Sequence, residues 1–260
     1  MADKSENRQK RSGAKPEKEG AYSLLRKDIL ELRLKPGAIL SIQTLCTHYG
    51  SSRSPMRDAL LRLAQEGLVT LLPQRGTMIS KIDFRRVEEE RFLRVSVERE
   101  VMAMFLRRRS RADVDFLTQS IPEQEACVAE GKLREFLAAD DEFHRRFYRA
   151  ADKDWCAATL DSVSGHYRRL RLLSVIDPAI SETILAQHRE MMEAIGENDG
   201  DRLLQVFGRH LKSLDDEEPG FFQKFPDLFE NVETGGRETD ALAGDFLQSL
   251  APGKKQQTDK

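Results

Sequence analysis

Residues 24–80 restrict the fold more than any other part of the chain, because short helices, turns and a hairpin follow one another in a fixed order. Apolar positions at helical spacing predict an amphipathic helix over residues 21–34: Leu25, Ile29, Leu32. Pro36-Gly37 ends this helix, since proline cannot continue the hydrogen-bond ladder. Ser41 is placed to cap a second helix over residues 42–49, and Gly50 to end it in a tight turn.

A third helix and a hairpin complete the pattern. Ser52 or Ser54 caps the helix, Pro55 occupies its first turn and Gly67 ends it. Two short apolar runs then flank a turn, which predicts a strand, a turn and a strand: 69–72, 73–76, 77–80. Two helices joined by a tight turn and followed by a hairpin form a winged helix-turn-helix, an architecture that binds duplex DNA.

The third helix begins with residues suited to reading DNA. Arg53 and Arg57 lie one turn apart near its N-terminus, the part of a recognition helix that reaches base edges. An arginine fork bonds guanine O6 and N7 in a bidentate way, and Ser52 and Ser54 add hydroxyls for phosphates or bases. The predicted wing places Arg75-Gly76 at its tip, where a guanidinium reaches a minor groove or a phosphate. The alternative is that these arginines only solvate a helix face.

The charge is unevenly distributed along the chain. Residues 20–81 hold nine basic and four acidic side chains, a net charge of +5, and residues 1–19 hold six and four, a net charge of +2. Because the whole chain carries −2, residues 82–260 carry −9. A basic N-terminal part on an acidic body is typical of a DNA-binding domain joined to a separate regulatory domain.

From Asp83 onward the sequence reads as successive amphipathic helices without a convincing strand. Breaks at short polar or glycine-containing stretches separate six expected helices: 84–109, 112–130, 133–150, 154–175, 178–197, 200–215. Short loops between helices predict an antiparallel all-α bundle. The expected fold is therefore mostly α, with a winged helix-turn-helix at residues 20–81 and a helical domain at residues 82–216.

Four polar residues fall on or beside the apolar stripes of these helices. Asp140 and His144 lie four apart and share one helix face, while His188 and His210 lie on two later helices. One carboxylate and three neutral imidazoles form a site suited to Zn²⁺, Ni²⁺, Mn²⁺ or Fe²⁺. Each histidine taken alone is more often a hydrogen-bonded core residue. Asp141 is the rival carboxylate, although it lies three residues from His144.

The remaining features concern compartment and termini. The sequence contains no run of about 18 apolar residues, so it predicts no membrane helix. The hydrophilic N-terminus lacks the apolar core of a signal peptide, and we therefore expect a cytoplasmic protein. Three widely spaced cysteines give no disulfide framework: Cys46, Cys127, Cys156.

We expect residues 1–19 to be disordered, and residues 217–260 to form a partly disordered extension with about fifteen loose residues at its end. Phenylalanines of this extension have the character to dock on the body or a partner: Phe221, Phe222, Phe225, Phe229.

The N-terminal motifs resemble the GntR family of bacterial transcription regulators. The resemblance covers the whole domain and is carried by Pro36-Gly37, Leu45, Gly50, Ser52-Arg53-Ser54-Pro55, Arg57, Ala59-Leu60, Leu63, Glu66-Gly67-Leu68 and Arg75-Gly76. It implies that Arg53, Arg57 and Arg75-Gly76 contact DNA. Some members carry a further arginine early in the second helix, where this chain has Gln43 and Thr44. This departure bears on the operator sequence more than on DNA binding itself.

The body resembles the FCD subfamily, whose all-helical domain carries Asp-x-x-x-His on one helix and a histidine on each of two later helices. The resemblance implies that Asp140, His144, His188 and His210 bind a metal ion. It also implies that Arg94 receives a carboxylate of a small effector, with a surface pair between Arg94 and Glu98 as the alternative. His166 is expected on a helix that lines the effector pocket.

The resulting hypothesis is a DNA-binding regulator that is not an enzyme, and a repressor rather than an activator. A homodimer binds a pseudo-palindromic operator in double-stranded DNA, and a small carboxylate effector at the metal alters that binding. One alternative is a regulator whose metal is structural or is itself the signal. A metal-dependent enzyme is the other, but the sequence shows no nucleophile or phosphate-binding glycine loop for it.

Overall fold

The computed structural model describes residues 20–212, 224–230 and 245–250. The expectations for residues 1–19, Phe221 and Phe222 lie outside the described residues. In chain order the described elements are α1 (Ala21–Leu30), β1 (Ile39–Leu40), α2 (Ile42–Tyr49), α3 (Arg53–Gln65), β2 (Val69–Leu72), β3 (Gly76–Ile79), α4 (Phe84–Arg108), α5 (Arg111–Ala129), α6 (Leu133–Ala150), α7 (Asp154–Val163), α8 (Gly165–Ser174), α9 (Pro178–Glu197), α10 (Gly200–Lys212), η1 (Pro226–Leu228) and α12 (Phe246–Leu250).

The N-terminal part is a three-helix winged helix-turn-helix with its own apolar core. The first helix ends earlier than the predicted residue 34, because the chain turns after Leu30 and Leu32 adopts a positive φ of 51°. The hairpin gains a short third strand that was not predicted, giving the antiparallel order β1-β3-β2. Gly76 permits this pairing: its φ is 117°, and a Cβ there would lie 2.7 Å from the Leu40 carbonyl oxygen.

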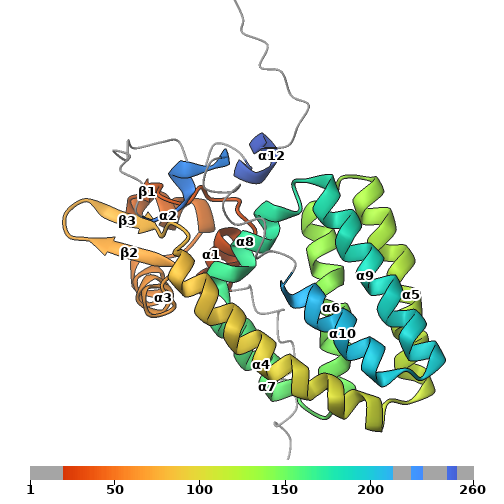
Figure 1. The fold of residues 1–260 in the computed structure, drawn as a ribbon. Coiled ribbons are helices and arrows are strands. Elements are labelled where there is room, and N and C mark those ends of the chain that lie inside the picture. The colour runs from red at the N-terminus through yellow and green to blue at the C-terminus, as the bar shows by residue number, and fades with distance from the viewer. Residues whose placement is uncertain (1–19, 213–223, 231–244, 251–260) are drawn as a thin grey trace, which may run out of the picture.

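The body is a bundle formed by α4 to α10, in which α5 packs on α6 and α9, and α10 packs on α4 and α9 (Figure 1). The predicted helix over residues 154–175 is wrong, because the chain breaks at Ser164 into α7 and α8. Gly165 opens α8 against the N-terminal part, where a Cβ would lie 2.7 Å from Leu68 Cδ2. The close approach of the two parts therefore accounts for both the break and the glycine.

Contacts through α8 join the N-terminal part to the bundle, where α8 lies beside α1 (Figure 1). The guanidinium of Arg169 is fully buried and donates a hydrogen bond of 2.6 Å to the carbonyl oxygen of Ser80. Residues from both parts share one apolar cluster, including Leu32 from the N-terminal part and Phe136 and Leu170 from the bundle. The N-terminal part is thus packed against the bundle.

Residues 224–230 and 245–250, which we call the C-terminal strap, lie across the junction. Ile82, in the connection between the two parts, forms a parallel β-bridge with Phe229, which is fully buried. Asp245 accepts hydrogen bonds from Arg134 of the bundle and lies 3.5 Å from Arg33 of the N-terminal part. The expected docking of the phenylalanines therefore holds for Phe229. The expected looseness of the chain end is wrong for residues 246–250, which form α12.

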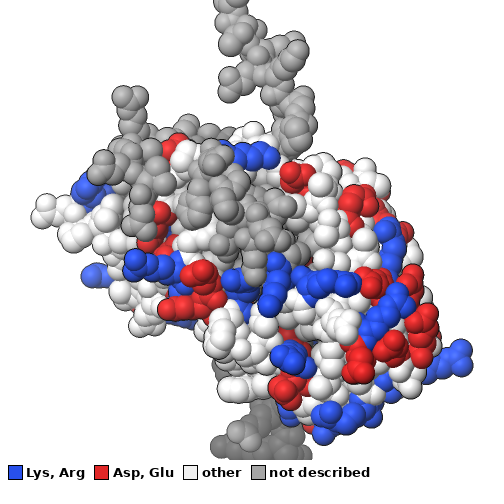
Figure 2. All heavy atoms as spheres, viewed as in Figure 1, with Lys and Arg blue, Asp and Glu red and all other residues white. Residues whose placement is uncertain are grey.

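The surface of the bundle carries interspersed charges of both signs on the face shown in Figure 2. Pairs such as Arg189–Glu125 and Arg202–Glu193 account for part of this pattern. Within residues 20–212, 224–230 and 245–250, no helix combines the length and the apolar character needed to cross a membrane.

Candidate DNA-binding and metal-binding sites

The recognition helix α3 buries one face and presents the other to solvent. Met56, Leu60 and Leu63 are at most 4% exposed and anchor the helix in the N-terminal core. The sequence-predicted contact residues at the start of this helix are all exposed: Ser52, Arg53, Ser54, Arg57. The helix-turn-helix core therefore leaves them available to a DNA groove.

The wing presents Arg75 as an exposed side chain between β2 and β3. Gln74 and Gly76 on either side of it both have positive φ values, 59° and 117°, which form the tight turn. On the second helix, Gln43 accepts a hydrogen bond of 3.2 Å from Arg53 Nη2. Gln43 thus holds the Arg53 guanidinium on the exposed surface of the helix-turn-helix.

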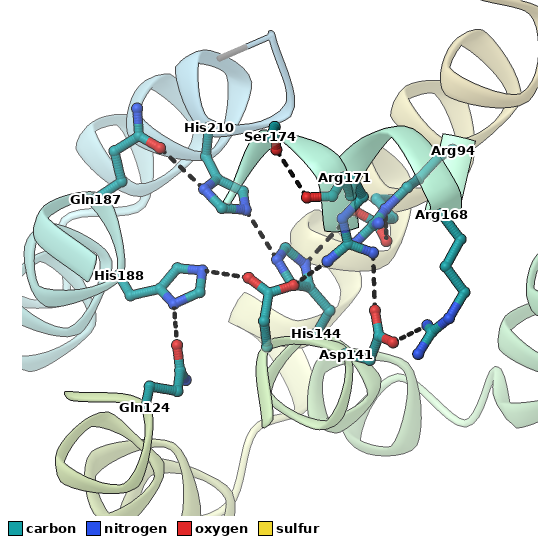
Figure 3. A network of polar contacts seen from close by, with 12 residues as sticks. Arg94, Gln124, Asp141, His144, Arg168, Arg171, Ser174, Gln187, His188 and His210 are labelled. Carbon is teal, nitrogen blue, oxygen red and sulfur yellow. Dashed lines mark hydrogen bonds and ion pairs between the residues drawn. The ribbon is translucent and has the colours of Figure 1, made fainter. Parts of the chain in front are cut away.

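The bundle brings together the four residues expected to hold a metal. Asp140 and His144 come from α6, His188 from α9 and His210 from α10. One potential ligand atom from each lies within 4.8 Å of the others. The Nε2 atoms of His144 and His210 are 2.9 Å apart, and His188 Nε2 lies 3.5 Å from an oxygen of Asp140 (Figure 3). The four donors therefore converge on one point inside the bundle.

The second ring nitrogen of each histidine faces an oxygen acceptor. His188 Nδ1 lies 2.8 Å from Gln124 Oε1, and His210 Nδ1 lies 2.9 Å from Gln187 Oε1 (Figure 3). His144 Nδ1 lies 3.6 Å from a Glu98 oxygen. The glutamine oxygens favour a proton on Nδ1 of His188 and His210 and leave their Nε2 lone pairs directed at the shared point, whereas His144 Nδ1 makes no hydrogen bond among the described residues. Sequence reasoning missed Gln124 and Gln187, for which a glutamine on the inner face of a helix was the available signal.

The carboxylates on α6 have different partners. Arg171 of α8 donates hydrogen bonds to Asp140 and to Asp141, and Arg168 also donates to Asp141. Asp140 directs its other oxygen toward His188. The structure thus places Asp140 with the histidines and Asp141 with the arginines.

Electrostatics keep the three histidines neutral at physiological pH. Burial lowers the pKa of His188 to about 4, even though the Asp140 charge raises it. Burial, reinforced by the positive charge of Arg94, holds the pKa of His144 well below its usual value. Burial and the neighbouring His188 do the same for the pKa of His210. Neutral imidazoles are the form that binds metal ions.

The donor set fits a divalent transition metal. His188 Nε2 is buried and has no hydrogen-bond partner among the described residues. Three imidazole nitrogens and one carboxylate oxygen match the preferences of Zn²⁺ and its neighbours, and His188, His210 and Asp140 have outer partners of the kind seen around protein metal sites. The residues present therefore fit such an ion.

A cavity of about 670 Å³ opens beside this cluster. Its lining includes His144, Arg94, Glu98 and Arg171. Arg94 is almost entirely buried and donates a hydrogen bond of 2.9 Å to Glu98. Arg94 is thus paired with Glu98, as in the surface-pair alternative, yet it lines the cavity rather than the solvent.

His166 lies elsewhere, at the junction of the two parts and outside the cavity lining. Its Nδ1 accepts a hydrogen bond of 3.0 Å from the backbone nitrogen of Asp83, at the start of α4. Burial, followed by the positive charge of Arg169, lowers its pKa to about 3. His166 therefore connects α8 to the segment that joins the two parts.

Comparison with known proteins agrees with both parts of the fold. Residues 17–79 match the model described as bacterial regulatory proteins, gntR family, and residues 91–213 match the FCD domain. An HTH-type transcriptional regulator of Streptomyces ambofaciens is 32% identical over 208 residues, covering 80% of this chain and 87% of that protein. The chain therefore belongs to the GntR family of bacterial transcription regulators and carries an FCD domain.

Further proteins are similar over most of the chain. The HTH-type transcriptional repressor RspR of Escherichia coli K12 is 27% identical over 214 residues, covering 82% of this chain and 94% of that protein. A GntR-type regulator structure from Rhodococcus sp. RHA1 has a TM-score of 0.65 at 19% identity, covering 76% of this chain and 95% of that one. E. coli McbR/YncC has a TM-score of 0.63 at 18% identity, covering 79% and 96%. The structural matches support the fold. The family assignment identifies a DNA-binding transcriptional regulator rather than an enzyme.

Proposed function

We propose that this regulator is a repressor whose FCD domain binds one divalent metal ion through Asp140, His144, His188 and His210. The observation that carries the proposal is the convergence of three imidazole nitrogens and a carboxylate oxygen within 4.8 Å, with Nδ1 of His188 and of His210 facing glutamine oxygens. Zn²⁺, Ni²⁺, Mn²⁺ and Fe²⁺ all suit this donor set. When bound, the ion supplies a Lewis-acidic position for an oxygen of a ligand in the cavity.

The charges around the cavity favour an anionic effector. Arg94, Arg168 and Arg171 balance three carboxylates, on Glu98, Asp140 and Asp141, all close to the histidines. A divalent ion then leaves an excess of two positive charges in a largely buried site. Because buried charge requires compensation, a small carboxylate beside Arg94 is the effector class that we propose.

DNA binding is assigned to the exposed start of α3 and to the wing. Arg53 and Arg57 read base edges, Ser52 and Ser54 contact phosphates or bases, and Arg75-Gly76 enters the adjacent groove. The name of the relative RspR, a repressor, supports the direction of regulation. The proposed compartment is the cytoplasm, where the chromosome of a bacterium lies.

A homodimer would bind a pseudo-palindromic operator with two recognition helices. The adjoining helices α4 and α7 expose large apolar side chains, with Phe92 at 74% and Trp155 at 78% of full exposure. Large exposed apolar side chains of this kind suit a self-complementary interface. We therefore propose that Phe92 and Trp155 contribute to the dimer contact, and sedimentation of a Phe92→Asp/Trp155→Asp variant as monomers would support this.

The experiment is a DNA-binding titration with the Zn²⁺-loaded protein. An operator is selected from a pool of random duplexes, and binding is followed by fluorescence anisotropy. We expect Arg57→Ala to lose preference for this operator while the control Arg107→Ala, an exposed arginine of α4, keeps it. Equal binding by Arg57→Ala and the unmodified protein would contradict the recognition-helix assignment.

The same titration separates the proposed effector response from its alternative. Addition of succinate to the Zn²⁺-loaded protein is expected to weaken operator binding, whereas succinate without metal has no effect. Release of DNA by Zn²⁺ alone, with no further change on adding carboxylates, would instead identify a regulator that senses the metal itself.

A further inference from the structure

The cavity beside the histidines is not confined to the bundle. The same cavity that reaches His144 and Arg94 also reaches the first helix of the DNA-binding part, through Ser23, Lys27 and Leu30 of α1. Its floor is therefore in the bundle and one of its walls is α1. A ligand that fills it contacts both domains at once.

The cations that line this cavity differ in one respect. Five of the six form an ion pair with a carboxylate: Arg26 with Glu66, Arg94 with Glu98, Arg145 with Asp161, Arg168 with Asp141, Arg171 with Asp140. The sixth is Lys27, for which residues 20–212, 224–230 and 245–250 provide no ion pair. Lys27 is thus the cavity's free positive charge, and it lies on the wall opposite the bundle.

The size of the cavity points to a ligand longer than a short monocarboxylate. Its volume of about 670 Å³ lies within the range of sites that enclose extended small molecules, roughly 300–1,000 Å³. Arg94 and Arg171, whose side chains are 11% and 12% exposed, line the cavity from the bundle, and the exposed Lys27 lines it from α1. Cations contributed by the bundle and by α1 to one cavity complement an anion with two separated acidic groups.

We propose that the effector is an extended dicarboxylate, with one carboxylate at the Arg94 and His144 end and the second at Lys27. This inference rests on the proposed function, since it uses the same site. It also assigns the route of regulation, because the second carboxylate joins the bundle directly to α1. A ligand of this kind binds one arrangement of the two domains better than others, which is the requirement for shifting between them.

The first helix is in turn connected to the recognition helix. Tyr22 of α1 donates a hydrogen bond of 2.5 Å to Glu66, which caps α3, and the Arg62 guanidinium of α3 lies 3.6 Å from the Tyr22 ring centre. Arg26 of α1 also pairs with Glu66 at 2.6 Å. A displacement of α1 by the ligand is therefore transmitted to α3.

The test is calorimetric binding of a chain-length series to the full-length Zn²⁺-loaded protein. The probes are malonate, succinate, glutarate, adipate, pimelate and suberate, with acetate and hexanoate as monocarboxylates. We expect affinity to rise at a defined dicarboxylate length, and Lys27→Ala to weaken binding of that diacid about fivefold while leaving acetate unchanged. The matched control is Lys212→Ala, which removes an exposed lysine outside the cavity.

The outcomes separate failure of the dicarboxylate inference from failure of the proposed metal-and-carboxylate function. If monocarboxylates and diacids of every length bind equally, or if Lys27→Ala binds all diacids like the unmodified protein, the dicarboxylate inference is wrong and the metal-and-carboxylate function stands. If no probe binds the loaded protein, the carboxylate site itself is wrong. Because Lys27 is exposed, loss of folding does not complicate the variant.

Discussion

His144 and His210 direct their Nε2 atoms at each other across 2.9 Å, while Nδ1 of His210 already faces Gln187 Oε1 at 2.9 Å. A neutral imidazole carries one N–H. If Nδ1 carries the proton on both rings, two lone pairs meet in a buried site where protonation is unfavourable. A cation placed between the rings and His188 resolves this arrangement, so the outer glutamines are expected to matter for metal binding.

Replacing Gln124 with alanine should weaken metal binding without removing a ligand. Gln124 is fully buried and faces His188 Nδ1, so its loss frees the ring to rotate or to change tautomer. Loss of such a partner typically weakens metal binding about 10- to 100-fold. Competition with a chromophoric chelator measures the change, and Gln119→Ala, an exposed glutamine on the same helix, is the control. Equal Zn²⁺ affinity in the two variants would show that Gln124 does not orient His188.

The buried His166 should make the stability of the protein depend on pH. Its folded-state pKa of about 3 lies below the ordinary value of 6.5, so the unfolded chain takes up the proton first. This stability is present above pH 6.5 and is lost progressively as the pH falls toward 3, by up to about 1.4 kcal/mol per pH unit.

A His166→Asn variant isolates this contribution in urea unfolding at pH 7 and pH 5. Asparagine keeps an acceptor for the Asp83 amide but does not titrate. We expect the drop in unfolding free energy between the two pH values to be smaller in the variant by about 2 kcal/mol. The same drop in both proteins would mean that His166 is not held neutral at the junction.

The C-terminal strap should hold the two domains together through Asp245. Its carboxylate accepts from Arg134 of the bundle and lies 3.5 Å from Arg33 of the N-terminal part. Asp245→Asn removes the charge from this bridge, which we expect to cost about 1.5–3 kcal/mol. Trypsin should then cleave faster after Lys81, in the connection that the strap covers.

Asp227→Asn is the matched control, because Asp227 is an exposed acid of the same strap. The cleavage rate after Lys81, followed by mass spectrometry, should stay at the level of the unmodified protein in this control. A rate that is unaffected by Asp245→Asn would show that the strap does not restrain the junction.

The sequence contained enough to predict the DNA-binding fold and the four converging residues of the bundle. The winged helix-turn-helix depends on local signals such as Pro36-Gly37 and Gly50, which act within a few residues. Asp140 and His144 share a face because of the helical repeat itself. Their convergence with His188 and His210 followed from the resemblance to the FCD subfamily, since helix-to-helix register is not encoded in spacing alone.

What the sequence did not predict depends on contacts between distant segments. The break at Ser164 arises where Gly165 meets Leu68 of the other domain, and the strand β1 exists because Gly76 lets β3 approach Leu40. The position of His166 follows from that same break. Pairing of Ile82 with Phe229 joins residues far apart in the chain, so no local pattern indicates it.

The most direct test of the account is elemental analysis of the purified protein, beside His188→Ala and the control His48→Ala. His48 is an exposed histidine of the DNA-binding part, remote in sequence from the cluster. We expect about one transition metal ion per chain in the unmodified protein and in His48→Ala, and loss of that ion in His188→Ala. Metal content below one tenth of an ion per chain in all three, even after incubation with Zn²⁺ or Ni²⁺, would contradict it and leave the histidines as packing residues of the bundle.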